Sequence, residues 1–369
     1  MAVSPNLDAS IGKGVCYALF AYDIGLAVDL SEADRRITAN KEPGSIRPKR
    51  RAPYYFEYSP PPLRVTEEAA PLTLGAFPTS PGVDVMLYDF GALSVTYRIP
   101  IEGSFATLLA LSEELYENAA LLADSRRRVE QLLTTIQPAV DRPNISDYVE
   151  DFVVFHIDSP AAPSGIPPWS GHEQELAQIL RCERVPLSDQ EVKDATACRI
   201  SYGPDDLALI DWNAALLFGL DLDDTRAVLE FANVELLEMR LLDRQLDDAL
   251  DQAYEVLSKR TWRPLGLLGV FEADTTRIAR LQVDSALLFE RVTNTLKLLG
   301  DQYLARVYRL ASQRFHLESW DSGILRKLQT LESIYTKMTD RAATRRLEAL
   351  EWIIIVLIAI SILVSFVPG

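Results

Sequence analysis

The strongest constraint on the fold is an apolar run at residues 352–367, WIIIVLIAISILVSFV, which has no charged residue and two serines. A helix over this run would be about 24 Å long, at the lower edge of what crosses the roughly 30 Å hydrocarbon core of a bilayer. Apolar side chains on every side leave no face for water. The run is therefore a membrane span, a buried core helix or an oligomerisation helix, and we favour the span.

The flanks of this run predict its orientation. Arg341, Arg345 and Arg346 precede it, whereas no Lys or Arg follows it. Positive residues stay preferentially on the cytoplasmic side, so we expect a single-pass tail anchor with the N-terminal body in the cytoplasm. The residues expected to form the membrane anchor are Trp352, Ile353, Ile354, Ile355, Leu357, Ile358, Ile360, Leu363 and Phe366.

Length, charge and cysteine content limit the class of protein. A chain of 369 residues is long enough for two or more domains, since a domain usually has about 100–200 residues. Its 53 acidic residues outnumber the 37 basic ones, and the resulting charge of −16 disfavours nucleic acid as a partner. Cys16, Cys182 and Cys198 are not spaced as a disulfide framework or zinc motif, which fits a reducing compartment.

The N-terminal body is predicted to be strand-rich and of the α+β class. Runs rich in Val, Ile, Tyr and Phe indicate strands at residues 15–22, 54–58, 83–90, 92–98, 152–157, 198–202 and 207–212. One long helix is expected from Gly103-Ser104 to Pro138, and another from Asp223-Asp224 to about Leu257. Each of these helices follows a strand-like hairpin.

The two hairpins are similar in sequence. Residues 83–92 and 205–214 align with matching Leu, Asp, aromatic and Ala positions. A ferredoxin-like, strand-rich unit closed by one long helix would then occur twice in the chain. Chance similarity is the alternative interpretation.

The C-terminal third is predicted to be a helical hairpin. After Pro264, apolar residues keep an approximate heptad spacing that is interrupted near Asp321-Ser322-Gly323. The seam is expected to drive oligomerisation through Leu281, Leu288, Val292, Leu299, Leu328 and Tyr335. The predicted domains are residues 1–146 and 147–262 for the two α/β units, 263–350 for the helical hairpin and 351–369 for the transmembrane anchor.

Catalytic motifs are weak in this sequence. It contains no phosphate-binding loop motif, nucleophile elbow, zinc spacing or paired-His helix motif. Asp89-Phe90-Gly91 spells the metal-binding triplet of kinases without their other motifs, so we interpret it as a turn. His156 near Asp158 could act as an oriented base, but a hydrogen-bonded strand histidine is the favoured interpretation. We therefore expect no catalytic residue, cofactor or bound metal.

A family resemblance adds to this interpretation. The run from Tyr303 to Val356, with its ending Leu350-Glu351-Trp352-Ile353-Ile354, resembles the required-for-meiotic-nuclear-division (YagE-like) proteins. In those proteins a helical segment leads into a terminal anchor of this type. Upstream, Tyr88-Asp89-Phe90-Gly91 looks like the family's Asp-Tyr-Gly. The resemblance implies a membrane-anchored domain, with organellar members linked to mitochondrial translation, and it supplies no catalytic motif.

These observations favour a membrane-tethered, non-enzymatic scaffold or interaction protein. Its expected partners are the lipid bilayer, further copies of the chain and an unidentified protein. The alternative is a metal-dependent enzyme that uses carboxylates near Asp211 and Asp221. Acids at the start of a helix also complement the helix dipole, however, without any metal.

Overall fold

The computed structural model describes residues 10–39, 46–47, 61–158, 169–258 and 302–365, with single helical positions at 279, 283, 286 and 290. By their contacts the residues form two compact units. The first comprises Met1–Leu241 with Leu288–Trp320, and the second comprises Leu242–Leu287 with Asp321–Gly369. The first unit contains the sheet and the helices packed on it, and the described part of the second unit is helical.

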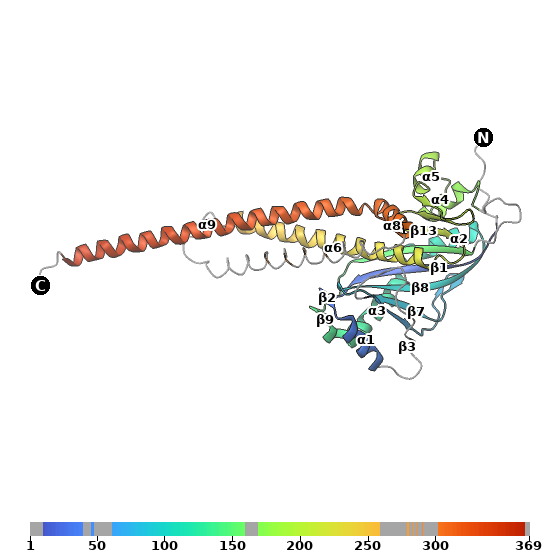
Figure 1. Cartoon of the computed structure of the whole chain (residues 1–369), viewed down its shortest axis with the longest axis horizontal. Helices are drawn as coiled ribbons and strands as arrows, with labels where there is room; N and C mark the ends of the chain where they lie inside the picture. Colours follow the sequence, from blue (N-terminus) through green and yellow to red (C-terminus); the bar gives the residue numbers. More distant parts are fainter. Residues whose placement is uncertain are drawn as a thin grey trace. The chain divides into compact units, whose positions relative to one another are not determined.

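The first unit is built on a nine-stranded mixed sheet (Figure 1). In spatial order its strands are β11 (Arg199–Ile200), β12 (Leu207–Ile210), β13 (Ala214–Phe218), β10 (Val149–Asp158), β1 (Ser10–Asp23), β8 (Ala92–Ser104), β7 (Val83–Leu87), β4 (Leu63–Glu67) and β3 (Ile46–Arg47). All neighbours are antiparallel except β10 and β13, which are parallel. The predicted strand-rich α+β body followed by helices is therefore confirmed.

Short strand pairs and helices complete the described chain. The pairs are β2 (Ala27–Val28) with β9 (Val140–Asp141), and β5 (Thr73–Leu74) with β6 (Phe77–Pro78). The helices are α1 (Leu30–Ala39), α2 (Phe105–Leu115), α3 (Ala119–Ile136), the 3-10 turn η1 (Gln137–Ala139), α4 (Glu173–Arg181), α5 (Asp189–Ala195), α6 (Asp223–Ser258), α8 (Gln302–Arg314) and α9 (Leu317–Ser365).

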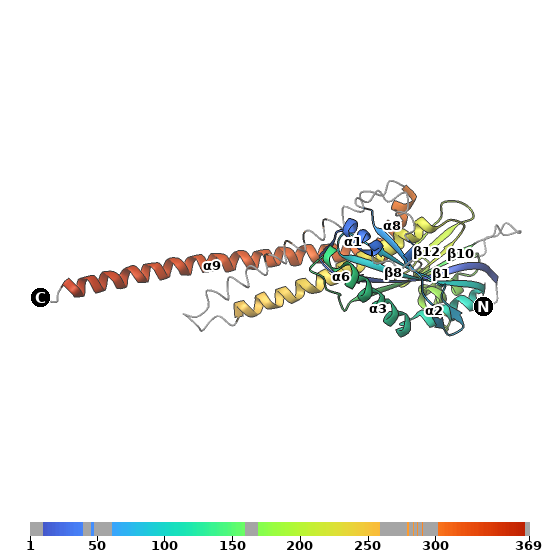
Figure 2. The same ribbon diagram turned by 90° about the horizontal axis from the view of Figure 1, so that it is seen from below.

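Helices cover both faces of the sheet, because its strands are apolar on both sides. On the first face, residues of α1, α2, α3 and α4 join a core that includes Phe20 and Tyr22 of β1. On the second face, residues of α6 and α8 pack on Leu19 of β1 and on Phe152 and Val154 of β10. Figure 2 shows α2 and α3 on one side of β1 and α8 on the other. Successive strand residues point to opposite faces, so β1 contributes to both cores.

The long helix predicted to end at Pro138 is two helices, α2 and α3. Glu117 between them has a positive φ of 48°. The side chain of Asn118 accepts a hydrogen bond from the backbone N–H of Leu121 at 3.0 Å, which caps the start of α3. The predicted stop is correct, since Pro138 lies in the 3-10 turn that follows α3.

The predicted repeat has a partial counterpart. The hairpin β7–β8 precedes α2, and the hairpin β12–β13 precedes α6. The two hairpins join the central strands differently, since β8 is antiparallel to its neighbour β1 whereas β13 is parallel to its neighbour β10. One continuous sheet includes both predicted α/β units. The ferredoxin-like repeat and the predicted domain limits at residues 146, 262 and 350 stay predictions.

The Asp89-Phe90-Gly91 triplet forms the turn of the β7–β8 hairpin, as interpreted from the sequence. The carbonyl of Gly91 accepts a hydrogen bond from Ile24 N–H at 2.8 Å, and that of Asp89 accepts one from Val28 N–H at 2.8 Å. Gly91 has a φ of +96°, and a Cβ added there would lie 1.8 Å from the carbonyl oxygen of Gly25. Only glycine fits this close approach of two backbone segments.

In the second unit, the later part of α6 lies beside α9 (Figure 1). Lys327 of α9 forms ion pairs with Asp243 at 2.6 Å and with Asp247 at 2.7 Å. Ile324 and Leu331, which are spaced seven residues apart on α9, are buried. Part of the predicted hairpin's second arm is therefore seen, with α6 as its neighbour, and the predicted first arm falls mostly outside the described residues.

The predicted membrane anchor is not found. Among the helices that the structure describes, none is both long and apolar enough to cross a bilayer. Within the apolar run, side chains are described only for residues 352–358. The side chains of Ile360, Leu363 and Phe366 lie outside the described part. This finding corrects the predicted transmembrane helix, the tail anchor and the single-pass membrane localisation with a cytoplasmic body.

Two acidic residues meet on the second face of the sheet. Glu238 of α6 is 1% exposed, and neither of its carboxylate oxygens has a hydrogen-bond partner among the described residues. Burial raises the pKa of Asp23, at the end of β1, to about 7. Burial, followed by the negative charge of Asp23, holds the pKa of Glu238 well above its usual range. An unpaired buried carboxylate is costly, so burial favours the protonated form of the Glu238 carboxyl.

This pair predicts a loss of stability with rising pH. Between the ordinary Asp value of 3.8 and about 7, the folded chain binds more protons than the unfolded chain. The stability that the protonated Asp23 carboxyl contributes is therefore complete below about pH 4, and it is lost as the pH rises through about 7. Urea unfolding of the wild-type chain should lose on the order of 2 kcal/mol over this interval. Glu238→Gln should reduce the dependence of the free energy of unfolding on pH, whereas the exposed control Glu332→Gln should leave it unchanged. Equal slopes for all three proteins would contradict the prediction.

The Gly91 turn predicts a large effect of one methyl group. Gly91→Ala should destabilise the chain by about 3 kcal/mol or more, because the Cβ clashes with a backbone carbonyl and the φ is strained. Gly203→Ala is the matched control, since its Cβ would lie 3.5 Å from Asp206 and its φ is not positive. Thermal unfolding of both variants measures the difference, and similar melting temperatures would show that the turn adapts.

Candidate functional site

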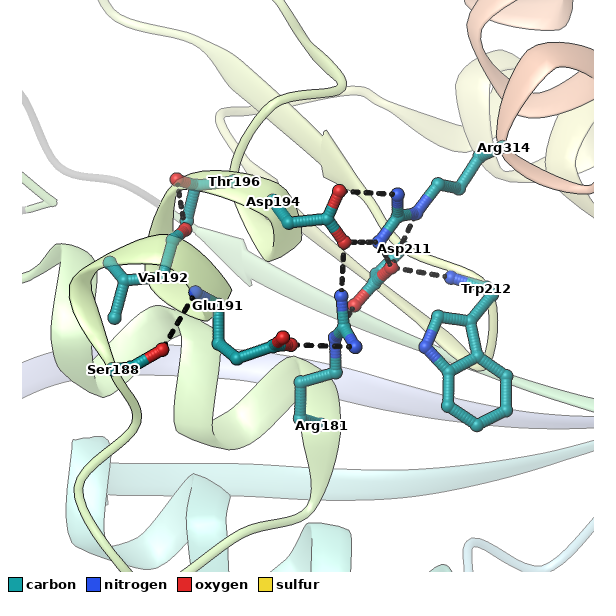
Figure 3. A network of polar contacts seen from close by, with 9 residues as sticks. All are labelled: Arg181, Ser188, Glu191, Val192, Asp194, Thr196, Asp211, Trp212 and Arg314. Atoms are coloured by element: carbon teal, nitrogen blue, oxygen red, sulfur yellow. Dashed lines mark hydrogen bonds and ion pairs between the residues drawn. The ribbon is translucent and has the colours of Figure 1, made fainter.

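A cluster of charged side chains surrounds Asp211, in the turn between β12 and β13 (Figure 3). Its side chain is completely buried. Arg181 Nε donates to one carboxylate oxygen at 2.5 Å, and Arg314 Nε donates to the other at 2.5 Å. The backbone N–H of Trp212 donates to the same carboxylate at 2.9 Å. Two guanidinium groups thus enclose one buried negative charge.

A second layer of carboxylates lies around the same arginines. Asp194 accepts hydrogen bonds from Arg181 at 2.6 Å and from Arg314 at 2.8 Å. Glu191 accepts a longer one from Arg181 at 3.4 Å. Both acids lie on α5, whereas the two arginines are the last residues of α4 and α8. The network therefore joins three helices to one strand turn.

Local sequence explains why these side chains meet. An arginine at the last position of a helix interacts favourably with the negative end of the helix dipole. Helix α5 is held in place by Ser188, whose hydroxyl accepts from Glu191 N–H at 3.2 Å, and by Thr196, whose hydroxyl donates to the Val192 carbonyl at 2.7 Å. Figure 3 shows α5 presenting Asp194 toward both guanidinium groups.

The contacts of this network shift the pKa values of Asp194 and Arg314 in opposite directions. Hydrogen bonds from Arg314 lower the pKa of Asp194. Burial lowers the pKa of Arg314, but its bonds to Asp194 and Asp211 outweigh burial and the net pKa is raised. A carboxylate with a lowered pKa and a guanidinium with a raised pKa neither take nor give protons near pH 7. The arrangement is suited to fastening α4, α5 and α8 to the sheet.

The expected carboxylates of the metal-site alternative are not brought together. Asp211 lies before the start of β13 and Asp221 lies after its end, and a strand of that length spans about 13 Å. Both oxygens of Asp211 already accept from arginines, whose positive charge repels a cation. Within the described ranges, no group of three or more His, Cys, Asp or Glu residues is placed to hold a metal ion.

His156 is engaged in a structural hydrogen bond. Its Nε2 donates to the carbonyl of Gly219 at 2.9 Å, and the side chain is 9% exposed. This contact matches the favoured interpretation of a hydrogen-bonded strand histidine.

The predicted oligomerisation residues are only partly described. Leu328 and Tyr335 on α9 are half-buried. The other four, Leu281, Leu288, Val292 and Leu299, lie outside the described residues. Of the predicted anchor residues, those from Trp352 to Ile358 lie on α9 and are exposed, with exposed fractions between 49% and 67% for residues 352–358.

Sequence reasoning missed the arginines of the network. Arg181 and Asp211 are 30 residues apart, Arg314 and Asp211 are 103 apart, and Arg314 and Asp194 are 120 apart. No local pattern links residues at such separations. The one available signal was that each arginine ends an amphipathic run, which predicts a helix end but not its partner.

The sheet-bearing part of the chain is similar in sequence to known proteins. A family model described as "Uncharacterized protein MJ0711, N-terminal domain" matches residues 13–225. The chain is similar to the Uncharacterized protein MJ0711 of Methanocaldococcus jannaschii, with 19% identity over 238 residues, which is 64% of this chain and 72% of that protein. No solved structure matches the chain.

These matches correct the resemblance inferred from the C-terminal third. The matching family is that of MJ0711, and the match covers residues 13–225 rather than the run from Tyr303 to Val356. The assignment to the required-for-meiotic-nuclear-division (YagE-like) family was wrong. A short apolar ending with a few matching letters is a weak signal, because many unrelated helices are rich in Ile, Leu and Val.

The arginine network predicts unequal effects of its two aspartates. Asp211→Asn should destabilise the chain by about 2–4 kcal/mol, because it leaves two partly buried guanidinium groups without their buried anion. Asp194→Asn should cost less than about 1 kcal/mol, because the Asp194 side chain is 54% exposed. Urea unfolding of the two variants gives the comparison. Equal losses would mean that Asp211 is not the centre of the network.

Proposed function

The chain belongs to the family of the Uncharacterized protein MJ0711, whose model covers the strand-rich body, and we propose that it is a non-enzymatic scaffold that self-associates through helix α9. The proposal assigns two roles to two parts of the chain. The helical α9 region brings copies together, and the sheet-bearing body presents surfaces to a protein partner.

Exposed apolar side chains on α9 are the observation that carries the proposal. The exposed residues are Trp352, Ile353, Ile354, Ile355, Val356, Leu357 and Ile358, and each is at least 49% exposed. Seven consecutive positions cover every side of a helix with 3.6 residues per turn. A helix that is apolar all round is normally buried, and contiguous exposed apolar patches mark interaction sites.

A second copy of α9 is the occupant that fits this surface. A helical run that is apolar on all sides needs apolar neighbours on more than one side. If copies of α9 pack in parallel, the apolar run of each copy lies beside that of its neighbours. Symmetric association of identical chains is also the commonest form of protein assembly. Upstream, Leu328 and Tyr335 leave part of their apolar surface accessible for the same contact.

A binding role fits the polar network of the body better than catalysis does. Its arginines keep their charge, and its carboxylates are held in ion pairs. The hydroxyl groups of Ser188 and Thr196 are used in helix hydrogen bonds rather than directed at a base. Catalysis by nucleophilic attack would require an activated group that these contacts do not provide.

Self-association can be tested on the full chain by light scattering. The wild-type chain should have a mass that is a multiple of one chain at micromolar concentration. Ile354→Asp combined with Leu357→Asp puts two charges on one side of the apolar run, and should shift the mass toward that of a single chain.

The matched control places the same charges at polar positions of the same helix. Thr330 and Thr344 of α9 are exposed, so Thr330→Asp combined with Thr344→Asp should leave the assembly unchanged. A single-chain mass for the wild-type protein at all concentrations would refute the proposal. So would an equal assembly in the apolar-run variant, because another surface would then hold the copies together.

A further inference from the structure

Three arginines gather on the second face of the sheet, beside the start of α6. Arg98 of β8 lies directly opposite Tyr17 of β1 in the antiparallel register, so both side chains point to the same face. Arg64 comes from β4, and Arg226 comes from the first turns of α6. The guanidinium carbon of Arg226 lies 4.8 Å from the centre of the Tyr17 ring.

Two of these arginines share one carboxylate. Arg64 Nη2 donates to Asp84 Oδ2 at 2.6 Å, and Arg98 Nη2 lies 3.3 Å from the same oxygen. The other oxygen of Asp84 accepts from the Thr66 hydroxyl at 2.5 Å. Each guanidinium group has five N–H donors, so one carboxylate cannot satisfy both. Both arginine side chains are 28% exposed and can reach a ligand from solvent.

Arg226 is more deeply buried, with 6% of its side chain exposed. Its Nη1 donates to Glu230 at 3.0 Å, and Glu230 also accepts from the Thr96 hydroxyl at 3.2 Å. The Nε atoms of Arg226 and Arg98 are buried and have no hydrogen-bond partner among the described residues. A buried donor without a partner costs free energy, which an acceptor from a ligand would recover.

The local charge favours an anion, although the whole chain has a net charge of −16. The three guanidinium groups face two buried carboxylates, Asp84 and Glu230. A third, Asp223, lies 3.8 Å from Arg226 but its side chain is 70% exposed. Water screens this exposed charge more than it screens the buried ones, so the cluster keeps an excess of positive charge.

Tyr17 is placed within this positive cluster. Burial raises the pKa of its hydroxyl, and the positive charge of Arg226 opposes that shift. Asp223 raises the pKa further, whereas Arg98 and Arg64 lower it. All three guanidinium charges thus act on one hydroxyl group, which keeps its proton at neutral pH and is available as a donor.

We propose that Tyr17, Arg64, Arg98 and Arg226 form a binding site for a phosphate group. A phosphate presents several oxygens in a tetrahedral arrangement, which can accept from two arginine forks and a hydroxyl together. Its negative charge would more than balance the one guanidinium group in excess of the two buried carboxylates, Asp84 and Glu230. Arg64, Arg98 and Tyr17 supply the direct contacts, and Arg226, whose guanidinium carbon lies over the Tyr17 ring, adds positive charge.

The test measures the melting temperature of the full chain with added sodium phosphate, against sodium chloride at the same ionic strength. Phosphate should raise the melting temperature by about 2 °C or more once it exceeds its dissociation constant tenfold. ADP is a second probe, and a larger rise with ADP assigns the phosphate to a nucleotide. Succinate tests a dicarboxylate, and a rise equal to that with phosphate would overturn the proposal.

Variants separate this site from general charge effects. Arg98→Gln should weaken phosphate binding at least tenfold by calorimetry, and Tyr17→Phe should weaken it several-fold while keeping the ring under Arg226. Arg126→Gln is the control, because Arg126 is an ion-paired arginine of α3 with a similar exposed fraction of 32%. The Tyr17→Phe variant decides the test if Arg98→Gln fails to fold. A phosphate affinity that is the same in Tyr17→Phe and the control as in the wild-type chain would overturn the proposal.

Discussion

Strand β1 is hydrogen-bonded along both of its edges, and the rest of the first unit depends on this constraint. It pairs with β8 from Ser10 to Asp23 and with β10 from Lys13 to Tyr22. A strand in this position meets no solvent at either edge, and its side chains must pack on both faces. The helices are distributed accordingly, with α1, α2, α3 and α4 in one core and α6 and α8 in the other.

Burial on both faces determines how polar residues are accommodated. Carboxylates that are buried beneath α6 or in the β12–β13 turn are shielded from bulk water, so their charged forms are stable only with partners of opposite charge. Asp211, Asp84 and Glu230 each accept from at least one arginine. Glu238 differs, because its carboxyl group stays uncharged rather than paired. Pairing and protonation are thus two solutions to one electrostatic problem within the same unit.

The sequence predicted features that depend on neighbours along the chain. Strand-forming runs, the hairpin turn at Gly91 and the helix starting at Asp223 all follow from local composition and turn chemistry. The break between α2 and α3 was missed because the apolar spacing continues across it. The side chain of Asn118 caps the start of α3, and apolar spacing does not indicate such a cap. The parallel pairing of β10 with β13 and the contacts of Arg314 join distant segments, which periodicity does not encode. The apolar run at residues 352–367 was wrongly interpreted as a membrane span, because hydrophobicity alone does not specify what covers an apolar helix.

The two outermost strands of the sheet limit how the sheet could pair with another molecule. Among the described strands the outermost ones are β11, Arg199–Ile200, and β3, Ile46–Arg47, each two residues long. An outer strand joins that of another molecule through its free N–H and C=O groups, and two residues offer few of them. Continuous growth of the sheet from chain to chain, the route to fibres, is therefore disfavoured by geometry. Short outer strands therefore limit aggregation through the sheet even in a chain whose helix α9 exposes apolar side chains.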